Sequence, residues 1–306
     1  MKICYTPKRF RALSMSIIEQ ADQIMRQYAQ DGYDLTLRQL YYQFIARDLF
    51  PGEWADKRTG SKNSEASYDR LGSLVNDARL AGLLDWEYLV DRTRPLRQAT
   101  TWDSPKQILE AATRGYQLDP WKEQPFYVEV WVEKDALLGV VAGVADRWRV
   151  PYLACRGYFS QSAQWRAAQR LWPQVKRGKM VRVIHLGDHD PSGIDMSRDN
   201  ADRLDLMAGE GIVVKRLALN MNQVEQYAPP PNPTKITDSR ANGYIERFGE
   251  ECWELDALEP QVIEGLIEGA IAECVNTRAW RRSMEQEEAN RSRLSALTTQ
   301  WVEDGV

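Results

Sequence analysis

Three acidic residues stand directly after two β-prone runs of the sequence. Glu133 follows Phe126–Val132, while Asp188 and Asp190 come just after Met180–Leu186. Ligands of open parallel sheets bind beyond the carboxyl ends of the strands, and side chains two positions apart in an extended segment point the same way. We therefore expect Glu133, Asp188 and Asp190 to converge. Three carboxylates repel one another unless a cation joins them, and hard oxygen ligands of this kind suit Mg2+ or Mn2+.

The segment after Asp190 adds a feature that suits phosphate. Pro191 and Gly193 permit a tight turn into a helix, and the N-terminus of a helix favours an anion. A metal ion beside it would neutralise charge on a phosphate, so the pattern predicts phosphoryl transfer. Lys134, at the same expected edge, has two interpretations: it contacts the reacting phosphate, or it pairs with Asp135.

The segments that would carry these residues alternate between strand and helix. This order predicts an α/β domain over residues 125–220, with right-handed crossovers and a Rossmann-like, four-stranded parallel sheet. We expect the two histidines, His185 within a strand and His189 between the aspartates, to be structural. The expected strands cover 126–132, 151–155, 180–186 and 212–219, and the expected helices cover 136–148, 160–172 and 192–207.

The first hundred residues have a different pattern. Apolar residues recur every three or four positions over 11–30 and 66–81, and Thr36 is a suitable N-cap for a helix that runs to Ala46. A short β element is expected over 82–90. Three helices followed by a short hairpin is the order of a winged helix, whose third helix would enter a DNA groove. We therefore expect a winged-helix domain over residues 1–100.

The remaining segments are expected to be mostly helical. A connecting region, 101–124, contains one expected helix at 105–116, and a C-terminal extension, 221–306, is expected to pack on the sheet domain. Glu254 and Asp256 share one side if their segment is extended. We favour the interpretation that this segment is a solvated packing edge. The alternative is that the two acids complete the cleft or bind a second metal ion.

The composition excludes several classes of function. The chain has 306 residues and a formal net charge of −4, so any contact with nucleic acid must come from a local patch. Its four cysteines are scattered, which indicates neither a zinc site nor a disulfide framework and favours a reducing cytoplasm. No apolar run approaches the roughly 20 residues of a membrane span. The presence of only two histidines excludes sites built from several scattered histidines.

A Glu that closes one strand and an Asp-x-Asp that closes another resemble the Toprim domain, the metal-binding module of topoisomerases, primases and certain nucleases. The sequences VEKDA at 132–136 and DHDPSG at 188–193 are most similar to the A subunit of topoisomerase VI and its relative, the meiotic double-strand-break transesterase. RGY at 156–158 is similar to the Gly-rich turn after that family's second strand. The resemblance covers about residues 30 to 220, and it implies that the three acids hold a catalytic metal ion.

The N-terminal half supports the same resemblance. The family carries Arg-x-x-Tyr-Tyr on a winged-helix domain, and the second tyrosine attacks a DNA phosphodiester. Thr36–Tyr42 matches, which implies that Tyr42 is the nucleophile and that Arg38 contacts phosphate. The chain departs from the family at Gln39, where an acid is usual. The resemblance also implies a homodimer in which Tyr42 of one subunit faces the metal site of the other, and it leaves room for a separate ATPase partner.

Basic side chains are the expected contacts to duplex DNA. The clearest basic run is at 92–97, which contains three arginines. Between positions 35 and 97, however, ten basic residues are offset by nine acidic ones, so this part of the chain has no strong excess of positive charge. The candidate contacts are Arg38, Arg70, Arg79, Lys134 and Arg156.

The function that these observations favour is metal-dependent cleavage of DNA strands, with Mg2+ or Mn2+ as the cofactor. Whether the cut passes through a tyrosyl–DNA intermediate is left open by the sequence. One alternative is a hydrolytic endonuclease, for example in defence against foreign DNA, in which Tyr42 is only structural. Another is a DNA-binding protein that uses the fold as a scaffold without catalysis. A primase is disfavoured because no zinc-binding motif accompanies the site.

Overall fold

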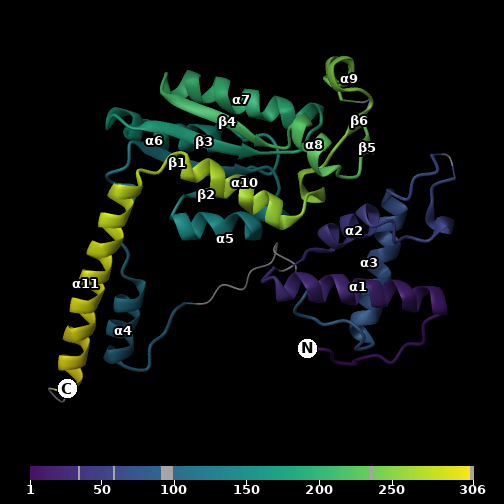
Figure 1. Ribbon diagram of the computed structural model, residues 1–306, viewed down its shortest axis with the longest axis horizontal. Coiled ribbons are helices and arrows are strands. Elements are labelled where there is room, and N and C mark those ends of the chain that lie inside the picture. Colours follow the sequence, from purple (N-terminus) through teal and green to yellow (C-terminus); the bar gives the residue numbers. More distant parts are fainter. Residues whose placement is uncertain (34, 58, 91–98, 235–237, 304–306) are drawn as a thin grey trace.

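The centre of the fold is a four-stranded parallel sheet with the strand order β2-β1-β3-β4 (Figure 1). The prediction of an α/β domain with a Rossmann-like parallel sheet is confirmed. The strands are β1 (Phe126–Val132), β2 (Tyr152–Ala154), β3 (Met180–Leu186) and β4 (Ile212–Ala218). The structure, a computed structural model, describes residues 1–33, 35–57, 59–90, 99–234 and 238–303.

Helices cover both faces of this sheet. Trp131 and Val183 face one layer of helices, and Val130 and Ile184, their neighbours in the strands, face the other. Because both faces are buried, β1 and β3 are apolar almost throughout rather than alternating. The first layer consists of α6 (Gln161–Lys176) and α7 (Pro191–Ala208), and the second of α5 (Leu138–Trp148), which follows a 3-10 turn at Asp135–Leu137, and α10 (Pro260–Ala272).

A helical domain with its own core precedes the sheet domain. Its buried cluster includes Ile24, Leu40 and Leu71, one from each of its three helices. The Thr36 side chain accepts from the backbone N–H of Gln39 and begins the second helix as predicted. The helices are α1 (Ala12–Gln30), α2 (Leu37–Ala46) and α3 (Glu65–Leu80), with a 3-10 turn at Gly52–Trp54.

The hairpin expected over 82–90 is not present, so the winged-helix prediction is confirmed only for its helices. Leu89 makes an isolated bridge to Leu35, and Ala81, just before the segment, makes one to Cys4, so the segment does not pair with itself. Its backbone groups have other partners: Arg79 Nη2 donates to the carbonyl oxygens of Trp86 and Leu89 at 2.5 and 3.0 Å, and the backbone of Leu35 bonds to Tyr88 and Val90. The basic run at 92–97 lies outside the described residues.

The C-terminal extension contacts both domains. The side chain of Ala257 belongs to the core of the helical domain, while Leu255 and Leu258 belong to the core of the sheet domain. Across the same boundary, Asn63 Nδ2 donates to Asn232 Oδ1 at 2.6 Å. The extension consists of α8 (Met221–Tyr227), β5 (Asn232–Pro233), α9 (Ala241–Phe248), β6 (Glu251–Cys252), a 3-10 turn at Leu255–Ala257, α10 and α11 (Thr277–Glu303).

Two helices project from the sheet domain as a pair. α4 (Pro105–Gly115), which confirms the helix expected in the connecting region, lies along α11. Figure 1 shows this pair at the end of the molecule opposite the helical domain. No helix among the described residues combines the length and the apolar character that crossing a membrane would require.

Candidate functional site

A groove of about 900 Å³ lies between the helical domain and the carboxyl ends of the strands. Tyr42 of α2 and the acids after β1 and β3 line it together, within a single chain. The resemblance implied that Tyr42 would face the site of a second subunit, and the single chain already brings Tyr42 to its own acids. The charged residues that line the groove are Arg38, Glu65, Asp69, Glu133, Lys134, Asp188, Asp190, Asp238 and Glu254.

The ends of β1 and β3 place Glu133 beside Asp188. Val132 pairs with Leu186 in the sheet register, so the residues that follow them meet at one edge. The backbone N–H of Asp188 donates to Glu133 Oε2 at 2.9 Å. Gly187 leaves space for this carboxylate, because a Cβ at that position would lie 2.9 Å from Glu133 Oε2. The strand register and this backbone hydrogen bond thus bring Glu133 and Asp188 together, as predicted.

The two aspartates of the Asp-x-Asp sequence have different partners. Asp188 Oδ1 accepts from the backbone N–H of Leu255 at 2.8 Å, and Asp188 Oδ2 pairs with Lys134 Nζ at 2.9 Å. Asp190 is the N-cap of α7, where its Oδ1 accepts from the backbone N–H of Gly193 at 2.6 Å. Asp188 therefore belongs to an ion cluster, and Asp190 helps to begin the helix.

Lys134 is the centre of that ion cluster. Its ammonium lies 2.8 Å from Glu254 Oε2 and 3.1 Å from Asp256 Oδ1, in addition to its contact with Asp188. The alternative that Lys134 pairs with Asp135 is wrong, because Asp135 pairs with Arg156 at 2.7 Å. One cation thus partly compensates three carboxylates.

The packing-edge interpretation of Glu254 and Asp256 is also wrong. Glu254 lines the groove, and Asp256 is buried with its Oδ2 unpartnered among the described residues. Burial raises the pKa of Asp256 to about 6. Burial also acts on Glu254, but Lys134 and Arg38 outweigh it and lower the pKa of Glu254 to about 2. Glu254 therefore stays ionised well into the acidic range, whereas Asp256 takes up a proton at about pH 6.

The acids carry more negative charge than the surrounding cations compensate. Burial, helped by the neighbouring charges of Asp188 and Asp190, raises the pKa of Glu133 to about 7. Carboxylates that hold protons near neutral pH in a cleft mark a place where a further cation would be favourable. Glu133, Asp188 and Asp190 offer carboxylate oxygens, the type of ligand atom that Mg2+ and Mn2+ prefer. The chemistry of these side chains therefore suits such a metal ion.

The geometry is not that of a ready-made metal site. Within the described ranges, no three acidic, histidine or cysteine side chains are arranged to hold a metal ion. The reason lies in the partners named above, since Lys134 and Leu255 already engage Asp188, and Gly193 engages Asp190. A metal ion would have to compete with those contacts.

The raised pKa of Glu133 predicts a stability effect that depends on pH. Between the unfolded value of 4.5 and the folded value of about 7, the folded state holds a proton that the unfolded state has released. Stability therefore falls as the pH rises through this window. In EDTA at pH 8, we expect Glu133→Gln to raise the free energy of unfolding by about 1–3 kcal/mol, and to have little effect near pH 4.

Urea unfolding at the two pH values measures this difference. The exposed Glu251, in β6, provides the control Glu251→Gln, which should change neither value. Lower stability of Glu133→Gln than of the wild type at pH 8 would show that the carboxylate is well compensated in the folded protein.

Tyr42 is enclosed by the groove. Only 3% of the residue is exposed, and its hydroxyl interacts with the side chains of Glu254 and Asn232. Burial raises the pKa of Tyr42, and the charges of Glu254 and Asp256 raise it further. As a nucleophile, Tyr42 would therefore need a nearby group to take its proton.

The predicted DNA contacts divide into two groups. Arg38 lines the groove, where its Nη1 pairs with Glu254 Oε2 at 2.9 Å and its guanidinium lies over Tyr68. Arg70, Arg79 and Arg156 do not line the groove. Arg70 lies over the Trp54 ring, and the guanidinium of Arg79 is used within the helical domain. Arg156 is exposed and bound to Asp135.

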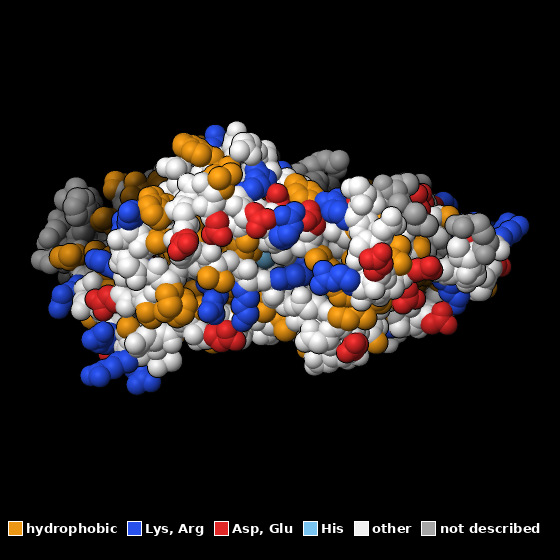
Figure 2. Space-filling view, turned by 90° about the horizontal axis from the view of Figure 1, so that it is seen from above, with side chains coloured by type: hydrophobic (Ala, Val, Ile, Leu, Met, Phe, Trp, Pro, Cys, Tyr) orange, Lys and Arg blue, Asp and Glu red, His pale blue; other side chains and the backbone are white. Residues whose placement is uncertain are grey.

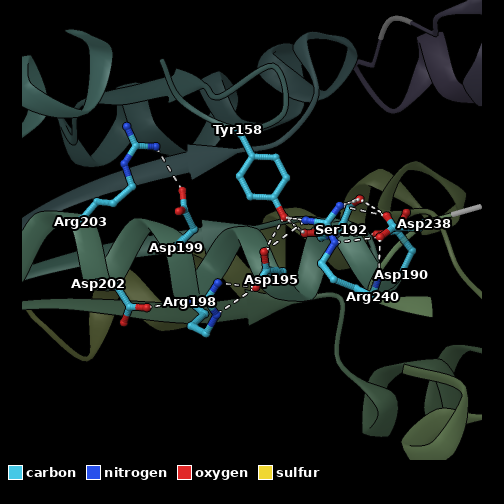
Figure 3. Close-up of polar contacts among 11 residues, drawn as sticks. Tyr158, Asp190, Ser192, Asp195, Arg198, Asp199, Asp202, Arg203, Asp238 and Arg240 are labelled. Carbon is cyan, nitrogen blue, oxygen red and sulfur yellow. Dashed lines mark hydrogen bonds and ion pairs between the residues drawn. The ribbon is translucent and has the colours of Figure 1, made fainter. Parts of the chain in front are cut away.

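A second polar network forms one wall of the groove, beside the N-terminus of α7. Arg240 donates to Asp238 and Ser192, and it also contacts Tyr158 (Figure 3). The Tyr158 hydroxyl in turn donates to Asp195 Oδ2 at 2.7 Å. The Arg-Gly-Tyr turn after β2 is thereby fixed to α7. Arg240 is fully engaged in this wall, which leaves Arg38 and Lys134 as the basic side chains that line the groove.

Arg216 is a half-buried residue of β4 that the sequence did not single out. Its Nη2 donates to the carbonyl oxygens of Gly187, Asp188 and Leu219 at 3.1, 2.6 and 2.9 Å. Its Nη1 donates to Gly193 O at 2.8 Å and also to Ser197 Oγ. Arg216 thus holds the whole turn from β3 to α7. The signal that could have revealed it is an arginine inside a strand of a sheet that is covered on both faces.

The face of the molecule that Figure 2 shows has no large area of one charge. Figure 2, which views the molecule from above, shows acidic and basic side chains interspersed over both halves. No protein-family model matches the sequence, and no curated protein matches it. The fold and the groove define an α/β protein with an acidic site at the carboxyl ends of a parallel sheet. What that site does has to be argued from its chemistry.

Proposed function

We propose that this protein cleaves DNA strands in the groove, in a reaction that depends on Mg2+ or Mn2+, and that Tyr42 is the nucleophile. The observation that carries the proposal is that Tyr42 and the three acids after β1 and β3 line one groove. A tyrosine hydroxyl beside buried carboxylates is the arrangement that the resemblance to the topoisomerase VI A subunit implies.

Each part of the groove has a role in the proposed reaction. Arg38 and Lys134 bind the negatively charged phosphodiester. The Tyr42 oxygen attacks phosphorus while its proton passes to a carboxylate of the groove. The bond from phosphorus to a deoxyribose oxygen breaks, and that oxygen takes up a proton as the strand end leaves. Glu133, Asp188 and Asp190 would hold the metal ion, which neutralises charge on the phosphate.

The balance of charge in the groove supports a need for added cations. Seven acidic side chains line it against two basic ones, so a DNA strand would bind more tightly with a divalent cation than without one. A homodimer, which the resemblance implies, would present two such grooves and cut both strands of a duplex. The proposal also includes a separate ATPase protein as a partner, which the resemblance leaves room for.

A hydrolytic endonuclease is the second candidate, and the burial of Tyr42 favours it. A side chain that is 3% exposed and has a raised pKa is poorly prepared for attack. In this version water attacks the phosphate, Tyr42 supports the wall of the groove, and the product is a free DNA end.

Supercoiled plasmid incubated with Mg2+ or Mn2+ tests both versions. We expect nicked or linear DNA with metal and none with EDTA. Half of each reaction is treated with protease before electrophoresis. Cut DNA that enters the gel normally only after protease treatment supports attack by Tyr42, whereas identical migration with and without protease supports hydrolysis.

Glu133→Ala is the control for this assay, and it should remove cleavage because Glu133 is central to the acidic site. Cleavage that persists in this variant would come from a contaminating nuclease or from another site. DNA binding without cleavage under any metal would point to a scaffold instead of an enzyme.

A further inference from the structure

Both basic side chains of the groove bind the same oxygen atom. Arg38 Nη1 lies 2.9 Å from Glu254 Oε2, and Lys134 Nζ lies 2.8 Å from it. The two donors come from different domains, since Arg38 is on α2 and Lys134 follows β1. A single oxygen between a guanidinium and an ammonium is the environment that proteins commonly provide for a phosphate oxygen.

The position of this oxygen relative to Tyr42 is informative. The Tyr42 hydroxyl interacts with the carboxylate of Glu254. An anion that took the place of that carboxylate would therefore lie against the tyrosine oxygen as well as against both cations. Near attack requires this kind of contact between nucleophile and phosphorus.

We propose that Glu254 Oε2 occupies the place of a non-bridging oxygen of the DNA phosphodiester, and that a bound strand displaces Glu254 from Arg38 and Lys134. This inference rests on the proposed function for its substrate class. It adds that the groove contains its own competing anion, which suppresses DNA binding until the strand exchanges with it.

Glu254 is the acid of the cluster that is best placed to move. Its side chain is 24% exposed, against 8% for Asp188 and 0% for Asp256. It lies in a short connection between β6 and the 3-10 turn at Leu255–Ala257. Lys134 keeps Asp188 and Asp256 as partners when Glu254 leaves, so the exchange does not leave its ammonium without partners.

Glu254→Gln tests the inference, because it removes the charge and keeps the size. Binding of a fluorescent duplex oligonucleotide is measured by anisotropy in EDTA, where no cleavage occurs. We expect the variant to bind about tenfold more tightly than the wild type, since a phosphate no longer competes with a carboxylate for two cations. The exposed control Glu251→Gln, a few residues away, should change the affinity by less than about twofold, as expected for a screened surface charge.

Arg38→Gln provides the second half of the test. In this background the gain from Glu254→Gln should shrink, because one of the two cations that the phosphate would inherit is gone. If Glu254→Gln does not fold, as judged by circular dichroism, Glu254→Asp withdraws the carboxylate by one methylene and should give a smaller gain in the same direction.

The outcomes separate this inference from the proposed function. If the wild type binds DNA and Glu254→Gln binds it equally or more weakly, the inference is overturned and the proposed function stands. If neither protein binds DNA in EDTA or with Mg2+, the inference and the proposed function are both overturned. A gain that is the same with and without Arg38 also overturns the inference, because it would reflect net charge alone.

Discussion

Replacing Tyr42 with phenylalanine should reduce DNA cleavage by at least about a thousandfold, because the change removes the only nucleophilic atom of that side chain. The ring stays in place against the core of the helical domain, so the fold and DNA binding should be retained. The readout is the rate of plasmid nicking with Mg2+ or Mn2+, together with the amount of DNA that is retained with protein before protease treatment.

Tyr41→Phe is the matched control for this experiment. Tyr41 is the preceding residue of α2, is equally buried, and bonds through its hydroxyl to Asn63 and Ser64 instead of the acidic site. It should lose about 1–2 kcal/mol of stability and keep its cleavage. Full activity of Tyr42→Phe, with no adduct in the wild type, would remove Tyr42 as the nucleophile and leave the hydrolytic version.

Replacing Arg216 with methionine should have the largest effect on stability, a loss of about 3–5 kcal/mol. Methionine can fill the space of the side-chain stem, but it cannot donate to the carbonyl oxygens of Gly187, Asp188 and Leu219. The oxygen of Gly187 would keep the backbone N–H of Leu219 as its donor, but the buried oxygens of Asp188 and Leu219 would lose the arginine as theirs. Cleavage should be lost as well, because the turn that carries Asp188 is no longer held. Urea unfolding and the plasmid assay measure the two effects.

Lys215→Met is the control, since Lys215 is adjacent in β4 but pairs with Glu273 at the surface. A surface pair of this kind contributes little, so the expected change is within about 1 kcal/mol. A loss for Arg216→Met no greater than that of Lys215→Met would mean that the turn is held by its backbone bonds without the arginine.

The sheet could be predicted from the sequence because its physical signal is strong and local. Phe126–Val132 and Met180–Leu186 are apolar on both faces, and the structure begins and ends β1 and β3 at those same residues. The caps Thr36 and Asp190 also act through residues only three positions away. Burial on two faces and short-range capping are both visible in a single sequence.

The segment over 82–90 could not be predicted in the same way. Its β-prone residues suggested a hairpin, but the competing partner is Arg79, a side chain on the preceding helix. Side-chain bonds from Arg79 to backbone carbonyls replace the ladder that the hairpin would have formed. Such competition depends on the direction in which one face of a helix points in the folded protein. The β-propensity of a segment carries no information about that direction.

The sequence predicted which acids after the strands belong to the candidate site. It did not predict which distant segments of the chain contact them. Glu133 and Asp188 follow from strand ends, whereas the position of Glu254 depends on a crossing of the chain more than a hundred residues later. The same crossing brings α2 to the acids within one chain, where the resemblance implied a second subunit. Contacts of such long sequence separation are invisible to a reading of local pattern.

The placement of Ala257 sets an order of events during synthesis. This residue fills part of the core of the helical domain, whose own helices end at Leu80. The part of this core that comes from the helical domain ends at Leu89, so Ala257 is synthesised well over a hundred residues after the rest of the core. The helical domain emerges from the ribosome first. Until residue 257 is made, its nascent form exposes the surface that the 3-10 turn at Leu255–Ala257 later covers. Chaperones that recognise exposed apolar surface would find it during that interval.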